Sequence, residues 1–443
     1  MAWSWNELFG ENHFLNINDL HRKYFGINAM DTTWDTTHFL SKTNYNYKRV
    51  TLYWSENIIK KVVVDEYKML NDGRIVSVFL TEHDTQLVTE NREYLLPLTS
   101  RGKKKKVNAT NVLAVYPMGC EFQYTLRYYE EGPQAYIFVR NIRSNQELAI
   151  GEEDRIHKIT SNDEFQSFME YYIKTCPENY FERIERMRNS KHVTVKYKPG
   201  DIFRIELDRF RYGYGIITGE ISKIRKWEEL PKRHSLRSLM TVPIMVRNYD
   251  LVTTNGNLSV EDLLNVPLDR LSICSDCDII WGTHPIIGHK ELDEEDLEFN
   301  IVCTKHTITN DHFTLFTEES FRNDGLFPKF EEYTLYVEWG TASVELPYSS
   351  LSPNLIQLLS NYTSPHAGVS ISIRADNWLL SKEERKTKYY WKNNLLEEYN
   401  KHIKEELFVC LGLDKNASFD DFARKYGGLS KEQILKKIIT YKK

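Results

Sequence analysis

Short strand-like apolar runs, separated by tight-turn signals, constrain the first part of this chain most strongly. The runs at 49–54, 58–65 and 75–80 suit half-buried strands, because successive strand side chains point to opposite faces. Asn71-Asp72-Gly73 separates the last two runs, and glycine accepts the positive φ that a hairpin turn needs. This spacing predicts antiparallel hairpins.

The strand pattern continues beyond these runs and then gives way to helix signals. Further strands are expected at 94–98, 112–116, 121–129 and 135–140, so residues 1–150 are predicted to form a β-rich or mixed α/β domain. Ser161 and Glu164 are spaced as a capping box ahead of an apolar stretch. We therefore expect residues 151–194 to be a helical linker.

A second β-rich segment covers residues 195–305, with strands expected at 202–207, 212–218, 242–246 and 279–281. Gly213 and Gly215 lie within one of these strands, which suggests a close backbone approach as in a small barrel. An α+β extension at 306–380 and an amphipathic helical tail at 381–443 follow. The predicted fold class is α+β and β-rich, with a central β-barrel-like module flanked by a mixed α/β N-terminal domain and a helical C-terminal region.

Composition limits the class of protein further. Aromatic residues reach 13% of the 443, which favours strands, and the formal net charge of −5 excludes a uniformly basic nucleic-acid coat. No apolar run is long enough for a transmembrane helix, so no membrane partner is expected. The first residues do not resemble a secretory signal, and six cysteines are too few for a disulfide framework. We expect a cytoplasmic protein.

A series of short motifs in the second β-rich segment is recognisable. In chain order the motif residues are Gly200, Asp201, Phe203, Tyr212, Gly213, Gly215, Trp281 and Gly288. Their order and spacing resemble the immunity 26 / phosphotriesterase HocA-like family over about residues 195–305. The resemblance implies a cytoplasmic bacterial immunity or defence protein that neutralises a cognate protein toxin by binding it directly.

The chemistry of these motif residues favours a structural role. Gly200 permits a tight entry into a strand, Asp201 can cap the turn, and Trp281 is expected to fill the core. The HocA part of the family name suggests a hydrolase. His284 and His289 lie five residues apart, but no Ser or Asp partner at a suitable spacing marks an active site.

An acidic segment, residues 291–298, follows the last motif and contains six acidic residues in eight positions. Many toxins are nucleases with basic clefts, and an acidic surface can mimic nucleic acid there. A solubilising loop is the plainer interpretation. The residues predicted to contact the partner are Glu291, Asp293, Glu294, Glu295 and Asp296.

The leading alternative is a Mg²⁺-dependent nuclease or restriction-type defence enzyme. Glu66 and Lys68 resemble the second half of a PD-(D/E)xK site, where a carboxylate binds the metal and the lysine positions the attacking water. Asp35, or Asp31, could supply the upstream carboxylate. The plainer interpretation of the pattern is a solvated strand end.

A basic segment, residues 101–106, supports a third interpretation as a nucleic-acid-binding module, because clustered cations bind phosphates with counterion release. It could instead dock on an acidic toxin or form a solvated loop. Its charged residues are Arg101, Lys103, Lys104, Lys105 and Lys106.

Four residues have zinc-ligand spacing. Cys274 and Cys277 form one C-x2-C pair, and Cys303 and His306 form a C-x2-H pair after 25 intervening residues. Three thiolates and an imidazole suit tetrahedral Zn²⁺, and the role would be structural because no coordination position stays open. The alternative is that the cysteines are buried small hydrophobic residues.

Overall fold

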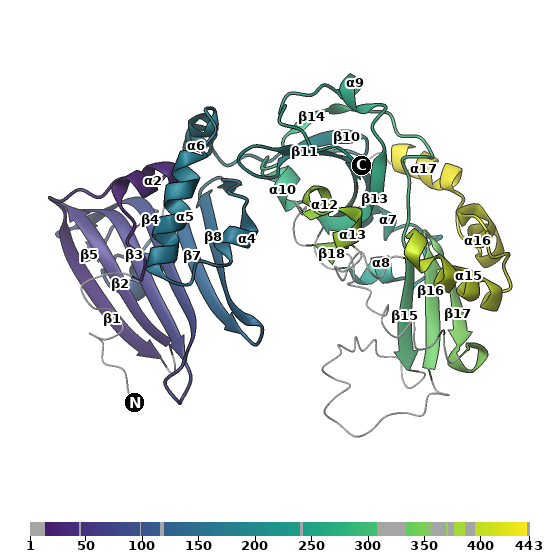
Figure 1. Cartoon of the computed structure of the whole chain (residues 1–443), viewed down its shortest axis with the longest axis horizontal. Helices are drawn as coiled ribbons and strands as arrows, with labels where there is room; N and C mark the ends of the chain where they lie inside the picture. The colour runs from purple at the N-terminus through teal and green to yellow at the C-terminus, as the bar shows by residue number, and fades with distance from the viewer. Residues whose placement is uncertain are drawn as a thin grey trace. The chain divides into compact units, whose positions relative to one another are not determined.

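The computed structural model describes residues 14–43, 46–97, 99–115, 119–239, 242–307, 333–352, 355, 369–370, 376–385 and 395–440. The chain divides into two compact units, each drawn in Figure 1. The N-terminal unit comprises Met1–Thr194, Glu206–Phe210 and Trp281–Thr283. The C-terminal unit comprises Val195–Ile205, Arg211–Ile280 and His284–Lys443.

An antiparallel sheet forms the N-terminal unit. Its strand path is β1-β2-β3-β4-β7-β8-β9, while β5 pairs with β4 and β6 pairs with β5. The strands are β1 (Asp35–Thr43), β2 (Asn46–Ser55), β3 (Ile58–Met69), β4 (Ile75–Glu90), β5 (Tyr94–Leu95), β6 (Lys105–Lys106), β7 (Cys120–Tyr129), β8 (Gly132–Asn141) and β9 (Gln146–Glu147). The runs predicted at 49–54, 58–65 and 75–80 are confirmed within β2, β3 and β4, and Gly73 in the turn has φ 86°.

Helices cover one face of this sheet (Figure 1). They are α2 (Asp19–Phe25), α4 (Glu153–Ile156), α5 (Asn162–Lys174) and α6 (Tyr180–Asn189). The predicted cap is confirmed, because the Ser161 side chain accepts the N–H of Glu164 at the start of α5. Residues 151–194 are thus helical, and they pack on the sheet because Phe165, Met169 and Tyr172 form an apolar stripe that joins its core.

A smaller core lies on the opposite face of the sheet, where Val50, Leu52 and Trp54 pack with Val112. Val112 belongs to helix α3 (Ala109–Ala114), so the strand predicted at 112–116 is wrong. The reason is local: the Asn108 side chain accepts the N–H of Asn111 and starts a helix.

Arg209, from the segment Glu206–Phe210, is fully buried in the N-terminal unit. Its guanidinium lies 3.8 Å from the centre of the Tyr172 ring and donates to the Tyr172 carbonyl at 2.7 Å. It also forms an ion pair with Glu152. A buried guanidinium needs partners of this kind, because an unpaired one is costly.

An open six-stranded sheet forms much of the C-terminal unit, in the order β14-β10-β11-β12-β13-β18. The strands are β10 (Asp201–Glu206), β11 (Tyr212–Glu220), β12 (Pro243–Tyr249), β13 (Leu268–Ser275), β14 (Ile286–His289) and β18 (Val369–Ser370). The predicted barrel is wrong for the described strands, because β14 and β18 end the sheet without closing it. The strand predicted at 279–281 is also wrong, since α10 (Cys277–Ile280) occupies these positions.

A three-stranded sheet and the C-terminal helices complete this unit around one core. Its strands are β15 (Ile301–Thr307), β16 (Tyr333–Trp339) and β17 (Ala342–Pro347), with Gly340 at φ 65° in the turn between the last two. The segment 381–443, predicted as a helical tail, contains α15 (Lys401–Cys410), α16 (Phe419–Tyr426) and α17 (Lys431–Thr440). Phe408, Phe419 and Ile434 bury its apolar side.

Short helical elements lie between the strands of the C-terminal unit or follow its last strand. They are α7 (Ile221–Ile224), α8 (Ser235–Ser238), α9 (Val260–Leu263), η3 (Tyr348–Ser350), α12 (Asp376–Leu379), α13 (Lys382–Arg385) and η4 (Glu398–Asn400). Across the part of the chain that the structure describes, no helix has the length and apolar character needed to span a bilayer.

Candidate partner-binding site

The start of the motif segment is held by contacts between β10 and β14. Asp201 and His289 are cross-strand neighbours, and a carboxylate oxygen of Asp201 lies 2.9 Å from His289 Nδ1. The other oxygen accepts the N–H of Lys198 at 2.8 Å. Gly200 has φ 93°, and a Cβ there would lie 2.4 Å from the Lys290 carbonyl oxygen. The backbone at this entry therefore excludes any side chain.

The motif glycines of β11 make room for aromatic rings. A Cβ at Gly215 would lie 2.4 Å from the Phe203 ring, and one at Gly213 would lie 2.7 Å from the Trp378 ring. Phe203 and Tyr212 are themselves buried. The close approach expected at these glycines is therefore between backbone and side chain, which explains why the pattern does not require a barrel.

Gly288 and Trp281 complete the motif in different ways. A Cβ at Gly288 would lie 2.3 Å from a methyl carbon of Val260, so this glycine also serves packing. Trp281, which was expected to fill the core, is only half-buried and belongs to the N-terminal unit. Its carbonyl accepts a hydrogen bond from the Gln146 side chain at 2.9 Å.

The two histidines near the motif contact different carboxylates. His284 is buried, stacks near Phe203 with ring centres 6.3 Å apart, and lies 3.8 Å from Asp278. His289 contacts Asp201 instead. The described side chains therefore do not bring the pair into one metal or active site.

One residue of the acidic segment is buried. Asp296 is 2% exposed, and its carboxylate accepts the Lys290 ammonium at 2.6 and 2.8 Å and the N–H of Asp293 at 3.0 Å. Leu292 and Leu297 of the same segment are also buried. Asp296 was expected to contact the partner. It is buried instead, and it anchors the segment.

The other predicted acidic residues of the segment are exposed. The Glu291 side chain is 85% exposed and lies 3.4 Å from His289 Nε2. Asp293 lies 3.5 Å from Lys290, whereas the Glu294 and Glu295 carboxylates form no ion pair with another described residue. An anchored backbone thus presents several weakly compensated negative charges.

The basic segment is exposed along its length. Lys105 and Lys106 form β6, and Lys104 pairs with Glu90 at 2.6 Å. A short strand that carries lysines is also a common way to protect a sheet edge. These cations are available to solvent, and one of them is already neutralised.

The structure separates the residues of the predicted nuclease site. Asp35 lies opposite Trp54 on β2, while Glu66 lies opposite Lys48 on the same strand. Six residues of strand separate these two positions, which corresponds to about 20 Å. Glu66 pairs with Lys48 at 3.4 Å, and Asp35 pairs with an arginine at 2.8 Å. Asp31 caps a turn through Thr33, and Lys68 is exposed beside Glu66 on β3.

The predicted zinc ligands belong to different sheets. Cys274 is in β13 and Cys303 is in β15. Burial raises the pKa of the Cys303 thiol to about 12 and that of Cys274 well above its usual value, as expected for buried cysteines. Cys277 accepts a bond from Ser275, and the His306 side chain lies outside the described residues. No group of three or more metal-binding side chains gathers in the described part of the chain.

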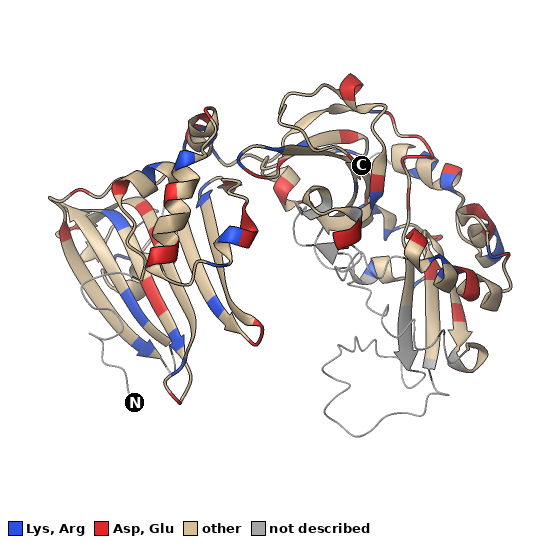
Figure 2. Cartoon of the chain, in the orientation of Figure 1, with Lys and Arg blue, Asp and Glu red and all other residues tan. Residues whose placement is uncertain are grey.

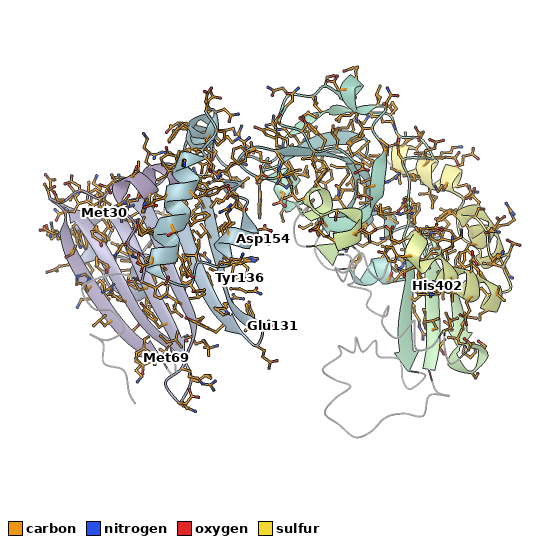
Figure 3. All side chains as sticks on the ribbon, viewed as in Figure 1. Met30, Met69, Glu131, Tyr136, Asp154 and His402 are labelled. Carbon is orange, nitrogen blue, oxygen red and sulfur yellow. The ribbon has the colours of Figure 1, made fainter. Side chains whose placement is uncertain are left out.

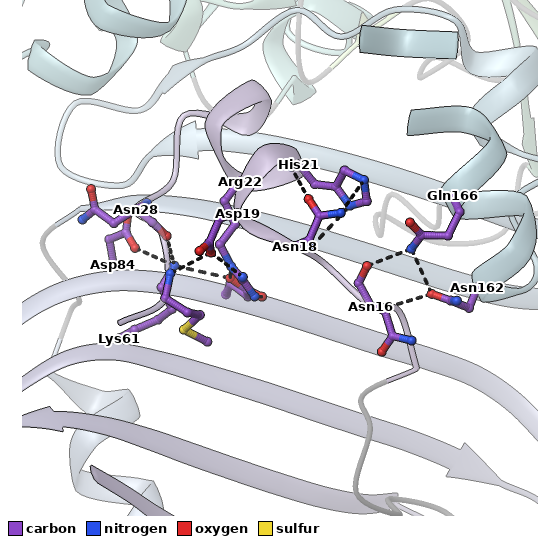
Figure 4. Close-up of polar contacts among 12 residues, drawn as sticks. Asn16, Asn18, Asp19, His21, Arg22, Asn28, Lys61, Asp84, Asn162 and Gln166 are labelled. Carbon is purple, nitrogen blue, oxygen red and sulfur yellow. Dashed lines mark hydrogen bonds and ion pairs between the residues drawn. The ribbon is translucent and has the colours of Figure 1, made fainter. Parts of the chain in front are cut away.

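A buried ion network in the N-terminal unit was missed by the sequence analysis. Lys61 is fully buried, and its ammonium lies 2.9 Å from Asp84 and 3.3 Å from Glu82 (Figure 4). Arg22 of α2 binds both oxygens of Glu82, at 2.9 and 3.0 Å. Burial alone would raise the pKa of Glu82, but Arg22 and Lys61 hold it below its ordinary value. Figure 2 shows charges of both signs along these strands.

A cavity of about 400 Å³ adjoins this network. Its lining is Leu15, Asn16, Ile17, Asn18, Arg22, Glu82, Asn162 and Gln166. The two charged side chains of the lining pair with each other, and the amides of Asn162 and Gln166 bond to Asn16 (Figure 4). The cavity therefore presents saturated charges and amides, which does not favour acid–base catalysis.

The β7–β8 hairpin presents tyrosines beside unpaired acidic groups. Tyr128, Tyr129 and Tyr136 are each about two-fifths exposed, at 45%, 42% and 39%. Glu130 and Glu131 at the turn form no ion pair with another described residue, and Glu131 projects away from the sheet in Figure 3. Tyrosine is enriched at the centres of protein interfaces, so this hairpin is a second candidate contact surface.

Comparison with known protein families identifies the central segment. Residues 198–313 match the family model described as Immunity protein 26, which confirms the resemblance and covers about a quarter of the chain. No curated protein and no solved structure matches the chain.

Proposed function

We propose that this chain, whose central segment belongs to the immunity protein 26 family, is a bacterial immunity protein that binds and neutralises a cognate toxin in the cytoplasm. The match over residues 198–313 is the observation that carries the proposal. The packing of Gly200, Gly213, Gly215 and Gly288 supports it, because the motif residues hold the fold and leave recognition to the surface.

The acidic segment is the contact surface that we favour. Glu291, Asp293, Glu294 and Glu295 stand on a backbone that is tied down by Asp296 and by the bond from Arg247 to the Glu295 carbonyl at 2.7 Å. A fixed array of negative charges raises the association rate with a basic partner, and the anchored backbone loses little conformational entropy on binding. A toxin with a basic nucleic-acid cleft fits this surface.

The nuclease alternative gains no support from the geometry. Asp35 lies far along the sheet from Glu66 and Lys68, and the buried acids Glu82 and Asp84 are saturated by cations. A metal-dependent site needs carboxylates that converge on one open position. Nucleic-acid binding by the basic segment stays an alternative. An affinity for nucleic acid that falls steeply with salt and depends on Lys103–Lys106 would indicate it.

Co-expression with a panel of toxin domains that have basic nucleic-acid clefts tests the proposal. We expect the chain to restore growth and to co-purify with the toxin as a stable complex. Reversal of three charges, Glu291→Lys with Glu294→Lys and Glu295→Lys, should weaken binding about tenfold or more. The matched control reverses the exposed Glu228, Glu261 and Glu432 and should bind as the unmodified chain does.

Two results separate the parts of the proposal. Absence of both protection and complex overturns the immunity function itself. Protection that survives reversal of the acidic segment leaves the function in place and moves the contact elsewhere. Glu130→Lys with Glu131→Lys then tests the β7–β8 hairpin.

A further inference from the structure

The first strand of the N-terminal sheet has one edge on which no other described strand pairs. Among the described strands, β1 pairs with β2 alone, through nine successive residues from Asp35 opposite Trp54 to Thr43 opposite Asn46. Eight of its nine residues are exposed, and the ninth, Phe39, is half-buried. Alternate residues of such a strand direct their N–H and C=O groups away from β2, where they can pair with another strand.

The far end of this sheet is partly covered, because the outer side of β8 bonds to β9, to the His157 carbonyl through the Ala135 N–H and to the Leu148 N–H through the Val139 carbonyl. At the far end of the strand path, β9 has only two residues, and β6 is a two-residue strand made of lysines. β1 has nine residues, contains neither proline nor glycine, carries one lysine, and pairs with β2 without a bulge. Long regular edges of this kind usually pair with a further strand, because proteins otherwise block them.

The residues of β1 match an antiparallel copy of themselves. Pairing centred on Phe39 places Phe39 opposite Phe39, Thr37 opposite Ser41, and His38 opposite Leu40 of the second strand. Aromatic pairs and hydroxyl pairs directly opposite each other stabilise antiparallel sheets. The polarity also fits, since the end with Asp35 meets the end with Lys42, whereas parallel pairing would bring like charges together.

The position of Phe39 strengthens this match. It lies opposite Val50 and packs against the small core formed by Val50, Leu52 and Trp54. A second Phe39 placed against it would extend that core across the new strand pair and bury apolar surface that one copy leaves exposed.

We propose that β1 pairs antiparallel with β1 of a second copy of this chain, centred on Phe39, so that two N-terminal sheets join into one. The occupant is a second copy because the strand complements itself in sequence, in charge and in the core it extends. The proposal is independent of the toxin-binding function.

Sedimentation of the full chain over a wide concentration range tests the proposal. We expect a dimer. Phe39→Asp and Phe39→Lys should each weaken self-association about tenfold or more, because each places like charges directly opposite. An equal mixture of these two variants should restore a dimer, since the register then pairs Asp with Lys. Leu264→Asp, a similarly drastic change at an exposed apolar residue of the other unit, should leave the dimer unchanged.

A chain that is monomeric at every concentration overturns the proposal, and so does a dimer that both Phe39 variants leave intact. Should the Phe39 variants fail to fold, as judged by circular dichroism, Leu40→Lys replaces them. Leu40 is 53% exposed, so its replacement spares the fold. It faces His38 of the second copy in the proposed register and should weaken the dimer, and an unaffected dimer again contradicts the proposal.

Discussion

Two groups of acidic side chains, one in each unit of this chain, are held in opposite ways. In the N-terminal unit, Glu82 and Asp84 are buried and share the fully buried Lys61. In the C-terminal unit, Glu294 and Glu295 are exposed and form no ion pair with another described residue. Buried charge is tolerated only with partners, whereas exposed charge can stay unpaired at small cost. The first arrangement therefore supports the fold, and the second is available to a partner.

The largest expected effect comes from removing the cation of the buried network. Lys61→Met leaves Glu82 and Asp84 without a shared counter-charge and should lower the free energy of unfolding by about 3–5 kcal/mol. Urea denaturation, combined with hydrogen exchange of β3 and β4, measures it. The neighbouring Lys60 bonds to Gln86 at the surface, so Lys60→Met should cost less than about 0.5 kcal/mol. An equal decrease in the free energy of unfolding in the Lys61→Met and Lys60→Met variants would contradict the comparison.

Glu338 is a buried acid that accepts hydrogen bonds from a neutral group. The pH dependence of stability therefore compares it with the acids that are paired with cations. Glu338 is 2% exposed, accepts the N–H of Ser235, and burial raises its pKa to about 7. The folded state therefore holds a proton that the unfolded state loses near pH 4.5. Stability from Glu338 should fall by about 3 kcal/mol as pH rises from 4.5 to above 7.

Comparison with Glu338→Gln isolates this contribution. The adjacent His234 acts in the opposite direction, because burial lowers its pKa to about 4 and its contribution is lost as pH falls from 6.5 toward 4. Denaturation curves between pH 5 and 8 should show the loss in the unmodified chain but not in Glu338→Gln. Identical pH profiles would show that Glu338 titrates normally.

A smaller effect separates the anchor of the acidic segment from its exposed members. Asp296→Asn weakens the bonds from Lys290 and should cost about 1–3 kcal/mol of stability. Glu294→Gln should change stability by less than about 0.5 kcal/mol while it weakens toxin binding. Thermal denaturation measures the first quantity and calorimetric titration the second. The distinction fails if Asp296→Asn is as stable as Glu294→Gln.

The smallest expected effect is that of a chelator. Cys274 and Cys303 lie in different sheets and both thiols are buried, so we expect EDTA to leave the thermal midpoint unchanged. A lowered midpoint, accompanied by zinc in elemental analysis, would show instead that the four spaced residues bind metal.

Apolar runs and turn chemistry were sufficient to predict the central strands of the N-terminal sheet, but not its edge. The middle of β2 and of β3 is buried on both faces, so these strands carry continuous apolar runs that a turn signal separates from β4. β1 is exposed on both faces and has no such pattern, and residues 35–43 were not expected to form a strand. Because β1 is exposed on both faces, its sequence has no burial pattern from which a strand could be predicted. The same exposure leaves the strand accessible for pairing.

The site residues show a similar division. The motif glycines could be assigned to packing because a glycine inside a strand is informative by itself, and only their ring partners required the structure. Lys61 stands within an apolar run, which was a usable signal of a buried charge. The identity of its partners, Glu82 and Asp84, depends on the β3–β4 register, which the sequence does not show. The inward direction of Asp296 likewise depends on contacts within its loop.

Calorimetric titration of the purified chain with the toxin domain against which it protects in co-expression tests the central claim most directly. The account predicts saturation at one toxin per chain, with the toxin's activity lost in proportion to the complex formed. Inactivation of the toxin by a small fraction of an equivalent would contradict it, because the chain would then act by turnover. Absence of any binding heat, with the toxin fully active, would contradict it as well.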